Sequence, residues 1–110
     1  MFHPVEIEEY HKRDAKPRLE FLASRWALKE ALVKASGNTR LSYKDIWLEK
    51  PPRIDGQSKP KPILKVSGTN EIHLFEELGI AKDGLHASIS HEEEFAVAMV
   101  TLEKYEEISL

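Results

Sequence analysis

The chain of 110 residues contains no cysteine, which excludes a disulfide framework and any metal site built from thiolates. Its apolar runs are short, and none approaches the roughly 20 residues that a membrane-spanning helix needs. The first residues lack the basic and apolar stretches of a secretory signal, and they are not arginine-rich like a transit peptide. With 41% hydrophobic and 32% charged residues, the sequence predicts one soluble globular domain, residues 1–110, without a membrane partner.

The chain also lacks an excess of positive charge, because its 19 acidic residues outnumber its 16 lysines and arginines. The basic stretches are short and scattered, so we expect no nucleic-acid partner. The five histidines show no metal-ligand spacing, and we therefore expect no zinc site.

The most informative stretch that is present runs from Phe21 to Ala35. Its apolar residues recur at helical spacing around nearly the whole circumference, which predicts a buried central helix over Arg18–Ser36. Gly37 and Asn38 supply a left-handed terminator. Four charged residues interrupt the stretch from Phe21 to Ala35, and burial of charge requires a partner, a wet cleft or a ligand: Arg25, Lys29, Glu30 and Lys34.

Glu30 and Lys34 lie one turn apart and share a face with the small residues Ala23 and Ala27. A carboxylate and an ammonium group without bulky neighbours suit a metal-bound phosphate. The alternative is an ordinary solvated pair, which stabilises a helix by about 0.2–0.5 kcal/mol.

The segments before and after the central helix predict a mixed fold. We expect a helix over Pro4–His11, a strand over Tyr43–Lys50 with Ile46 and Leu48 on one face, and an antiparallel strand over Ile63–Val66. A further helix over Ser67–Leu78 is expected to turn Ile72, Phe75 and Leu78 inward and to stop at Gly79.

The last third of the chain predicts a β-hairpin. Its strands are Leu85–His91 and Phe95–Leu102, with Glu92–Glu94 as the turn, and both faces of the second strand read as buried. The tail Glu103–Leu110 reads as frayed. The predicted fold class is α+β, with a small antiparallel sheet packed on one long central helix.

Several of these segments together resemble a known family. Trp26–Lys34 is similar to the aromatic-x-x-Lys-Glu-Ala/Ser-x-x-Lys signature of 4′-phosphopantetheinyl transferases. Ser88–His91 followed by Phe95–Ala98 resembles the closing hairpin of that family. Other stretches resemble its short, holo-acyl-carrier-protein synthase type: Phe2–Glu6, Phe21–Arg25, Ala35–Gly37 and Tyr43–Ile46.

The resemblance implies transfer of phosphopantetheine from coenzyme A to a serine of an acyl carrier protein, with release of 3′,5′-ADP. It implies that Glu30 is catalytic and binds Mg²⁺, and that Lys34 contacts the pyrophosphate and stabilises the leaving group. It also implies a cytoplasmic enzyme, with a mitochondrial location as the alternative, that serves fatty acid biosynthesis or polyketide synthesis.

Further residues are candidates for binding coenzyme A. Arg25 binds a phosphate of the nucleotide end or pairs with Glu20 or Asp45, and Lys29 lines the same cleft or pairs with an acid such as Asp45. Backbone donors of Ser36 and Gly37 meet a phosphate or only cap the helix. Ser90 and His91 contact the nucleotide or belong to an ordinary turn. These candidates are Arg25, Lys29, Lys34, Ser36, Gly37, Ser90 and His91.

The chain departs from the family pattern at one place. Family members open with a Gly-x-Asp strand, whose Asp is a metal ligand, and a helix that docks the carrier protein, and neither precedes Phe2. We therefore expect a single transferase-like domain that is N-terminally incomplete. The resemblance implies a homotrimer with its site between subunits. The alternative is a non-catalytic remnant that at most binds coenzyme A or a partner subunit.

Overall fold

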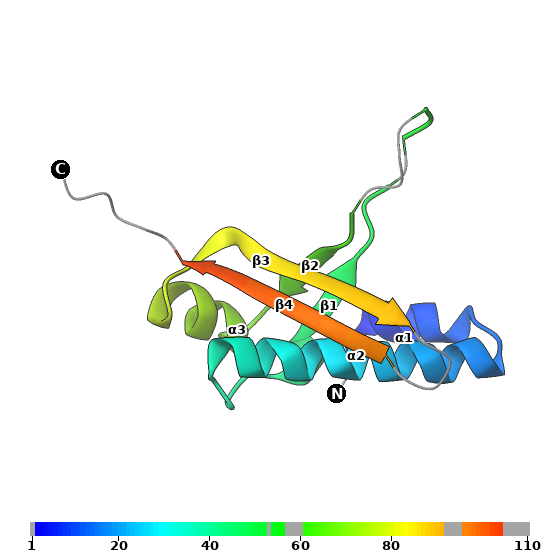
Figure 1. Cartoon of the computed structure of the whole chain (residues 1–110), viewed down its shortest axis with the longest axis horizontal. Helices are drawn as coiled ribbons and strands as arrows, with labels where there is room; N and C mark the ends of the chain where they lie inside the picture. The colour runs from blue at the N-terminus through cyan, green and yellow to red at the C-terminus, as the bar shows by residue number, and fades with distance from the viewer. Residues whose placement is uncertain (1, 53, 57–60, 92–95, 105–110) are drawn as a thin grey trace.

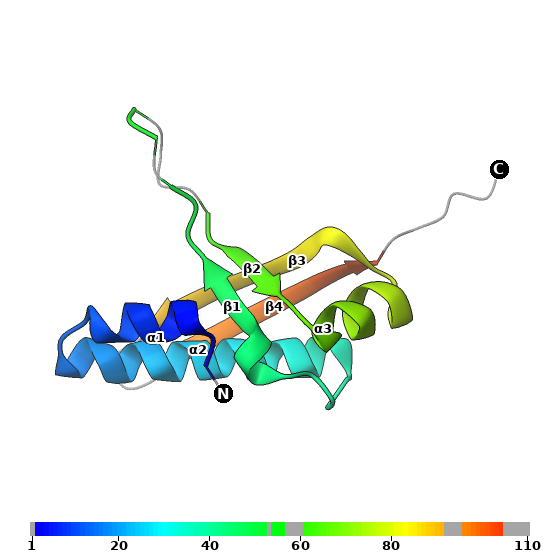
Figure 2. The same cartoon turned by 180° about the vertical axis from the view of Figure 1, so that it is seen from behind.

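The computed structural model describes residues 2–52, 54–56, 61–91 and 96–104. Its elements, in chain order, are α1 (Pro4–His11), α2 (Ala15–Ser36), η1 (Tyr43–Asp45), β1 (Ile46–Glu49), β2 (Ile63–Val66), α3 (Thr69–Glu71), η2 (Ile72–Glu77), β3 (Ile80–His91) and β4 (Ala96–Lys104). The β3–β4 hairpin runs along one side of α2 (Figure 1). The other side carries α1 and the β1–β2 hairpin (Figure 2). The two hairpins meet where β2 packs against β3.

Helix α1 has the bounds that the sequence predicts, and its first turn is closed by His3. The Nδ1 atom of His3 accepts a hydrogen bond from the backbone N–H of Val5 at 3.1 Å, and the backbone N–H of His3 donates to Glu6 Oε1 at 3.0 Å. This reciprocal capping satisfies donors that the helix itself leaves free. The His3 ring also stacks on Trp47 of β1, with centroids 3.8 Å apart, so the cap fixes the start of α1 against β1.

Helix α2 begins at Ala15, three residues before the predicted start, because Pro17 is tolerated in a first turn. It ends as predicted, with Gly37 at φ 68°. The prediction of burial around the whole circumference is wrong. Leu28 and Leu32 are fully buried, but Leu19 is 70% and Trp26 37% exposed, so the helix covers the core with one face only.

The β1–β2 hairpin pairs antiparallel as predicted, with Ile46 opposite Val66 and Leu48 opposite Leu64. Ile46 and Leu48 are buried on the predicted face. The start of the predicted first strand, Tyr43–Asp45, is instead the 3₁₀ turn η1.

The helix predicted over Ser67–Leu78 is a short α3 followed by the π-helical turn η2, and Gly79 stops it at φ 74°. Phe75 and Leu78 pack against the core as predicted, but the prediction for Ile72 is wrong, because Ile72 is 46% exposed while Leu74 is fully buried. The cause is Asn70, whose buried amide accepts from Ser42 N at 2.8 Å and donates to Ser42 O at 2.9 Å. This anchor turns Asn70 and Leu74, one turn later, toward the core.

The β3–β4 hairpin has the predicted antiparallel pairing, and β3 starts earlier, at Ile80, with an irregularity before Leu85. Burial of both faces of β4 is wrong, because Val97 is 51% and Met99 66% exposed. Within the described residues the strands form two separate two-stranded sheets rather than one small sheet, and the α+β class is as predicted. The predicted turn Glu92–Glu94 and the tail beyond Lys104 lie outside the described residues.

The apolar core joins the elements on both sides of α2. Its buried members are Leu28, Leu32, Leu41, Ile46, Leu48, Leu64, Val66, Leu74 and Ile80. Among the residues described, the longest helix carries too many charged groups to be a candidate for crossing a bilayer.

The core position of Leu28 makes a stability prediction. Leu28→Ala removes a side chain that is fully buried, and we expect a loss of about 2–5 kcal/mol in the free energy of unfolding, measured by urea denaturation. The matched control on the same helix, Leu19→Ala, is expected to change it by less than about 0.5 kcal/mol. Equal effects of the two variants would contradict the assignment of the buried face.

Candidate functional site

The four charged residues between Phe21 and Ala35 divide between two sides of α2. Arg25 and Lys29, one turn apart, are 7% and 0% exposed and face the core. Glu30 is half-buried and Lys34 is exposed on the outward side. Since each residue advances about 100° around a helix, Arg25 and Glu30 point about 140° apart. The predicted site residues on α2 therefore do not share one face.

Lys29 lies at a junction of four elements. Its Nζ donates to Glu6 Oε1 of α1 at 2.6 Å and to the backbone carbonyls of Tyr43 and Ile46 at 2.5 and 2.7 Å. The sequence predicted either the ligand cleft or a pair with an acid such as Asp45. The structure places Lys29 in the core with Glu6 as its carboxylate partner.

The buried pair has a marked electrostatic cost. The pKa of Lys29 is below its ordinary value, and the largest cause is burial away from solvent. The hydrogen bond and the charge of Glu6 partly offset this shift, whereas the charge of Arg25 adds to it. Glu6 is only 2% exposed, and its Oε2 atom has no hydrogen-bond partner among the described residues. The ammonium group thus meets one carboxylate oxygen and two backbone carbonyls.

Arg25 is held beside α1 as well. Its Nη1 donates to Ser24 Oγ at 3.2 Å, its Nη2 lies 4.0 Å from Glu9 Oε2, and its guanidinium lies 4.5 Å from the centre of the Phe21 ring. Burial lowers the pKa of Arg25, and Glu9 opposes that shift. The acid beside Arg25 is Glu9, where the sequence suggested Glu20 or Asp45.

Arg25 lines a cavity of about 560 Å³ between α2, the ends of the β1–β2 hairpin and β3. Its walls carry four cationic side chains, one carboxylate and an apolar floor; they include Arg13, Arg25, Lys50, Lys61, Glu20, Phe21, Leu48, Ser88 and Ile89. Guanidinium and ammonium donors beside apolar surface can hold a phosphate next to a flat ring.

Glu30 offers the simplest oxygen ligand on the outward face. Within the described residues it makes no hydrogen bond or ion pair, and no group of three histidine or acidic side chains comes together there. Mg²⁺ needs only one or two carboxylates and keeps several waters. A single unpaired, half-buried carboxylate fits that requirement.

Ser36 and Gly37 form the C-terminal cap of α2. Ser36 Oγ donates to Val33 O and accepts from Asn38 N, both at 3.1 Å, and Gly37 N donates to Val33 O at 2.9 Å. These donors already serve the helix end, which matches the cap alternative.

Ser90 is exposed at the other end of the molecule, where β3 ends beside α1 (Figures 1 and 2). The side chain of His91 lies outside the described part.

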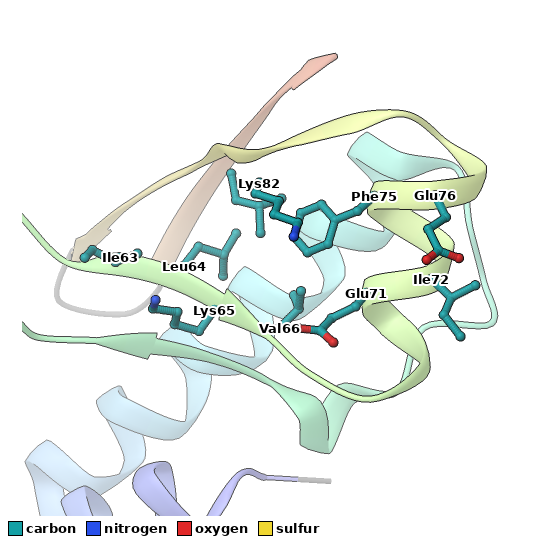
Figure 3. A pocket seen from close by; sticks show the side chains of 10 residues that line it. Ile63, Leu64, Lys65, Val66, Glu71, Ile72, Phe75, Glu76 and Lys82 are labelled. Atoms are coloured by element: carbon teal, nitrogen blue, oxygen red, sulfur yellow. The ribbon is translucent and has the colours of Figure 1, made fainter. Parts of the chain in front are cut away.

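A second cavity, of about 430 Å³, lies between β2, η2 and the start of β3 (Figure 3). Its apolar wall includes Leu64, Val66 and Phe75, and its charged rim mixes Lys65 and Lys82 with Glu71 and Glu76. None of the predicted site residues lines it, so it is distinct from the Arg25 cavity.

The sequence analysis did not identify Glu6 and Glu9 as partners of Arg25 and Lys29. Their position one turn apart on α1 was visible, but nothing in the sequence showed that α1 would lie against Arg25 and Lys29. That contact depends on the chain reversal between His11 and Ala15.

Comparison with known proteins defines the class of this fold. The family model for the 4′-phosphopantetheinyl transferase superfamily matches residues 1–100. The chain is 34% identical over 90% of its length to a holo-[acyl-carrier-protein] synthase of Bacillus pumilus, and 41% identical over 94% to one of Trichlorobacter lovleyi. The crystal structure of Thermotoga maritima holo-[acyl-carrier-protein] synthase matches 94% of the chain with a TM-score of 0.60 and 32% identity. The chain therefore belongs to the 4′-phosphopantetheinyl transferase superfamily.

The resemblance predicted from the central helix and the closing hairpin is thus confirmed, as is the fold class. The chain spans 70% and 75% of the length of the Bacillus pumilus and Trichlorobacter lovleyi relatives, and 52% of the Thermotoga maritima chain.

The Lys29–Glu6 pair makes a prediction about pH. Glu6→Gln leaves a buried ammonium without its counter-charge, and we expect a loss of about 3–5 kcal/mol in unfolding free energy at neutral pH. Without Glu6, the pKa of Lys29 falls further below the ordinary lysine value of 10.5. The unfolded state then binds more protons, so stability rises as the pH increases toward that value.

Urea denaturation between pH 7 and pH 10 measures this effect against wild type. The control Glu8→Gln removes an exposed carboxylate of the same helix, which lies 3.4 Å from Lys12, and we expect a change of less than about 1 kcal/mol at any pH. A loss in Glu6→Gln that stays constant with pH would show that removing Glu6 does not lower the pKa of Lys29 in the folded protein, and would contradict the prediction.

Proposed function

We propose that the protein transfers 4′-phosphopantetheine from coenzyme A to a serine of an apo acyl carrier protein, giving the holo carrier protein and 3′,5′-ADP. Family membership and relatives named holo-[acyl-carrier-protein] synthase support this activity. The observation that carries it in the chain itself is the Lys-Glu pair of α2, with Glu30 facing outward beside Lys34 and Lys29 held inside. The non-catalytic alternative has no comparable support.

The cationic cavity around Arg25 is our candidate for the nucleotide end of coenzyme A. Arg13, Lys50 and Lys61 share that cavity with Arg25, so several donors can face phosphate oxygens. Phe21 and Leu48 supply apolar surface for the base. Binding there fixes the substrate and leaves the pyrophosphate free to reach another surface.

The reacting groups belong to the outward face of α2. Glu30 would hold Mg²⁺, which when bound neutralises charge on the phosphate oxygens. The carrier serine attacks the phosphorus that bears pantetheine, the bond from that phosphorus to the bridging oxygen breaks, and 3′,5′-ADP leaves. Lys34 stabilises the charge on the leaving group, and Glu30 is our candidate to receive the serine proton.

The two halves of this site require two copies of the chain. Arg25 and Glu30 point about 140° apart around one helix, so one protomer cannot present both to the same pyrophosphate. We therefore propose a homo-oligomer, a trimer in keeping with the resemblance, in which the Arg25 cavity of one protomer faces Glu30 of its neighbour. The exposed apolar row of Val97 and Met99 on β4 gives such an assembly apolar surface to bury.

The relatives compared above come from bacteria, which supports a cytoplasmic rather than a mitochondrial enzyme. The carrier protein would place the reaction in fatty acid biosynthesis, with polyketide synthesis as the alternative destination.

The activity is tested by intact mass of an apo acyl carrier protein after incubation with coenzyme A. We expect a gain of one phosphopantetheine that requires Mg²⁺ and that Glu30→Ala reduces by at least about 100-fold. Glu71→Ala is the control and should retain full activity, because Glu71 is an exposed acid that lines the second cavity and not the Arg25 cavity. No mass gain with any apo carrier protein tested would refute the transferase.

The shared site is tested by mixing two inactive variants. Arg25→Ala and Glu30→Ala are expected to be weak enzymes alone, and their co-expression should restore activity because some interfaces then combine an intact Arg25 with an intact Glu30. Restored transfer above the sum of the separate variants supports the two-copy site. A mixed oligomer, verified by differential tags, that stays as inactive as its parents would contradict it.

A further inference from the structure

We propose that Glu6 is a positioning residue for Glu30, and that it acts through Lys29. The proposal rests on the function proposed above and adds to it a residue on a different helix. Glu6 does not touch the substrate in this scheme, because it is 2% exposed and faces the core side of α2. Its effect is on where α2 presents its outward face.

Lys29 directly precedes Glu30 in the chain and is joined to it through the backbone. The two side chains leave the helix about 100° apart. Any rotation or sliding of α2 that displaces Lys29 Nζ displaces Glu30 on the other side. Fixing the inner residue therefore fixes the outer one.

The ammonium group of Lys29 is hydrogen-bonded from three different directions. Its Nζ meets a carboxylate from α1, a carbonyl from η1 and a carbonyl from β1, at 2.6, 2.5 and 2.7 Å. Oxygen atoms from three elements locate one nitrogen in space. The leucines that pack on the same side of α2 impose no such directional constraint, because apolar contacts tolerate small shifts.

The carboxylate of Glu6 is held in place by a second partner as well as by Lys29. The oxygen that accepts from Lys29, Oε1, also accepts from the backbone N–H of His3 at 3.0 Å. The capping box of α1 thereby sets the position of the carboxylate. A line of fixed groups runs from His3 through Glu6 and Lys29 to the turn of α2 that carries Glu30.

A purely structural role makes a different prediction, and this allows a test. Two buried apolar side chains of similar size often stabilise a fold as well as a buried ion pair does. The double variant Glu6→Met with Lys29→Met should therefore fold with a melting temperature near that of wild type. If the pair only stabilises the fold, such a variant should also work normally.

We expect this double variant to fold and yet to lose function. The half-saturating Mn²⁺ concentration, measured by electron paramagnetic resonance in the presence of coenzyme A, should rise about 10-fold or more, and kcat should fall by a similar factor. KM for coenzyme A should change less, because neither residue lines the Arg25 cavity. The control is the exposed pair of α1, Glu8→Met with Lys12→Met, which should match wild type in every measurement.

A second variant covers the case in which the double variant does not fold. Glu6→Asp keeps both charges but shortens the carboxylate by one methylene, and we expect a folded protein with a smaller shift in the same direction. Mn²⁺ binding and kcat equal to wild type, in whichever of the two variants folds, would overturn the proposal.

Failure of the proposed function is distinguishable from failure of this inference. If wild type shows no transfer, the transferase is refuted, and amide hydrogen exchange of residues 28–32 decides the positioning role. Exchange about 10-fold faster in the double variant than in wild type and the Glu8/Lys12 control would support positioning of this turn. Unchanged exchange would refute it.

Discussion

The hydrogen-bonded ion pair between Lys29 and Glu6 is the interaction on which the arrangement of the other elements depends. It brings α1, α2, η1 and the start of β1 to one buried nitrogen atom. Removing charge from water is costly, and the carboxylate and two carbonyls offset that cost only while all of them stay in place. The pair therefore demands one relative placement of these elements, whereas the apolar core would accept several.

Because this ion pair fixes how α2 packs, the helix has two chemically different faces. Its inner face is defined by Arg25 and Lys29 with their acidic partners on α1, and its outer face carries Glu30 and Lys34. The same helix thus lines the Arg25 cavity on one side and carries the proposed reacting groups on the other. In the proposed scheme neither face alone is a complete site, which is why the scheme needs two copies of the chain.

The sequence predicted most of the local structure. Capping residues and the glycine stop fixed α1 and the end of α2, and alternation identified the β1–β2 hairpin with Ile46 and Leu48 inward. The errors in predicting which side chains are buried share one cause, because burial depends on residues that are distant in the sequence and close in the fold. Alanines made α2 look apolar all round, and Asn70, whose partner Ser42 is 28 residues away, turned Leu74 rather than Ile72 toward the core.

The same limit applies to the candidate site. Glu30 and Lys34 were proposed from spacing and family resemblance. Pairing of Lys29 with an acid was one of the predicted alternatives, but the acids that meet Arg25 and Lys29 were not identified because both lie on α1. No local pattern connects Glu6 to Lys29 across 23 positions.

The stacking of His3 on Trp47 makes tryptophan fluorescence a probe of how α1 packs. The chain has two tryptophans: Trp47 lies under the ring that caps α1, and Trp26 lies on α2 with its ring 5.2 Å from that of Tyr43. The stacked ring covers one face of the Trp47 indole, so undocking of α1 exposes that face to water and changes the environment that its emission senses. The emission of Trp47 therefore reports whether the first helix is docked, and that of Trp26 reports on the solvent-facing side of α2.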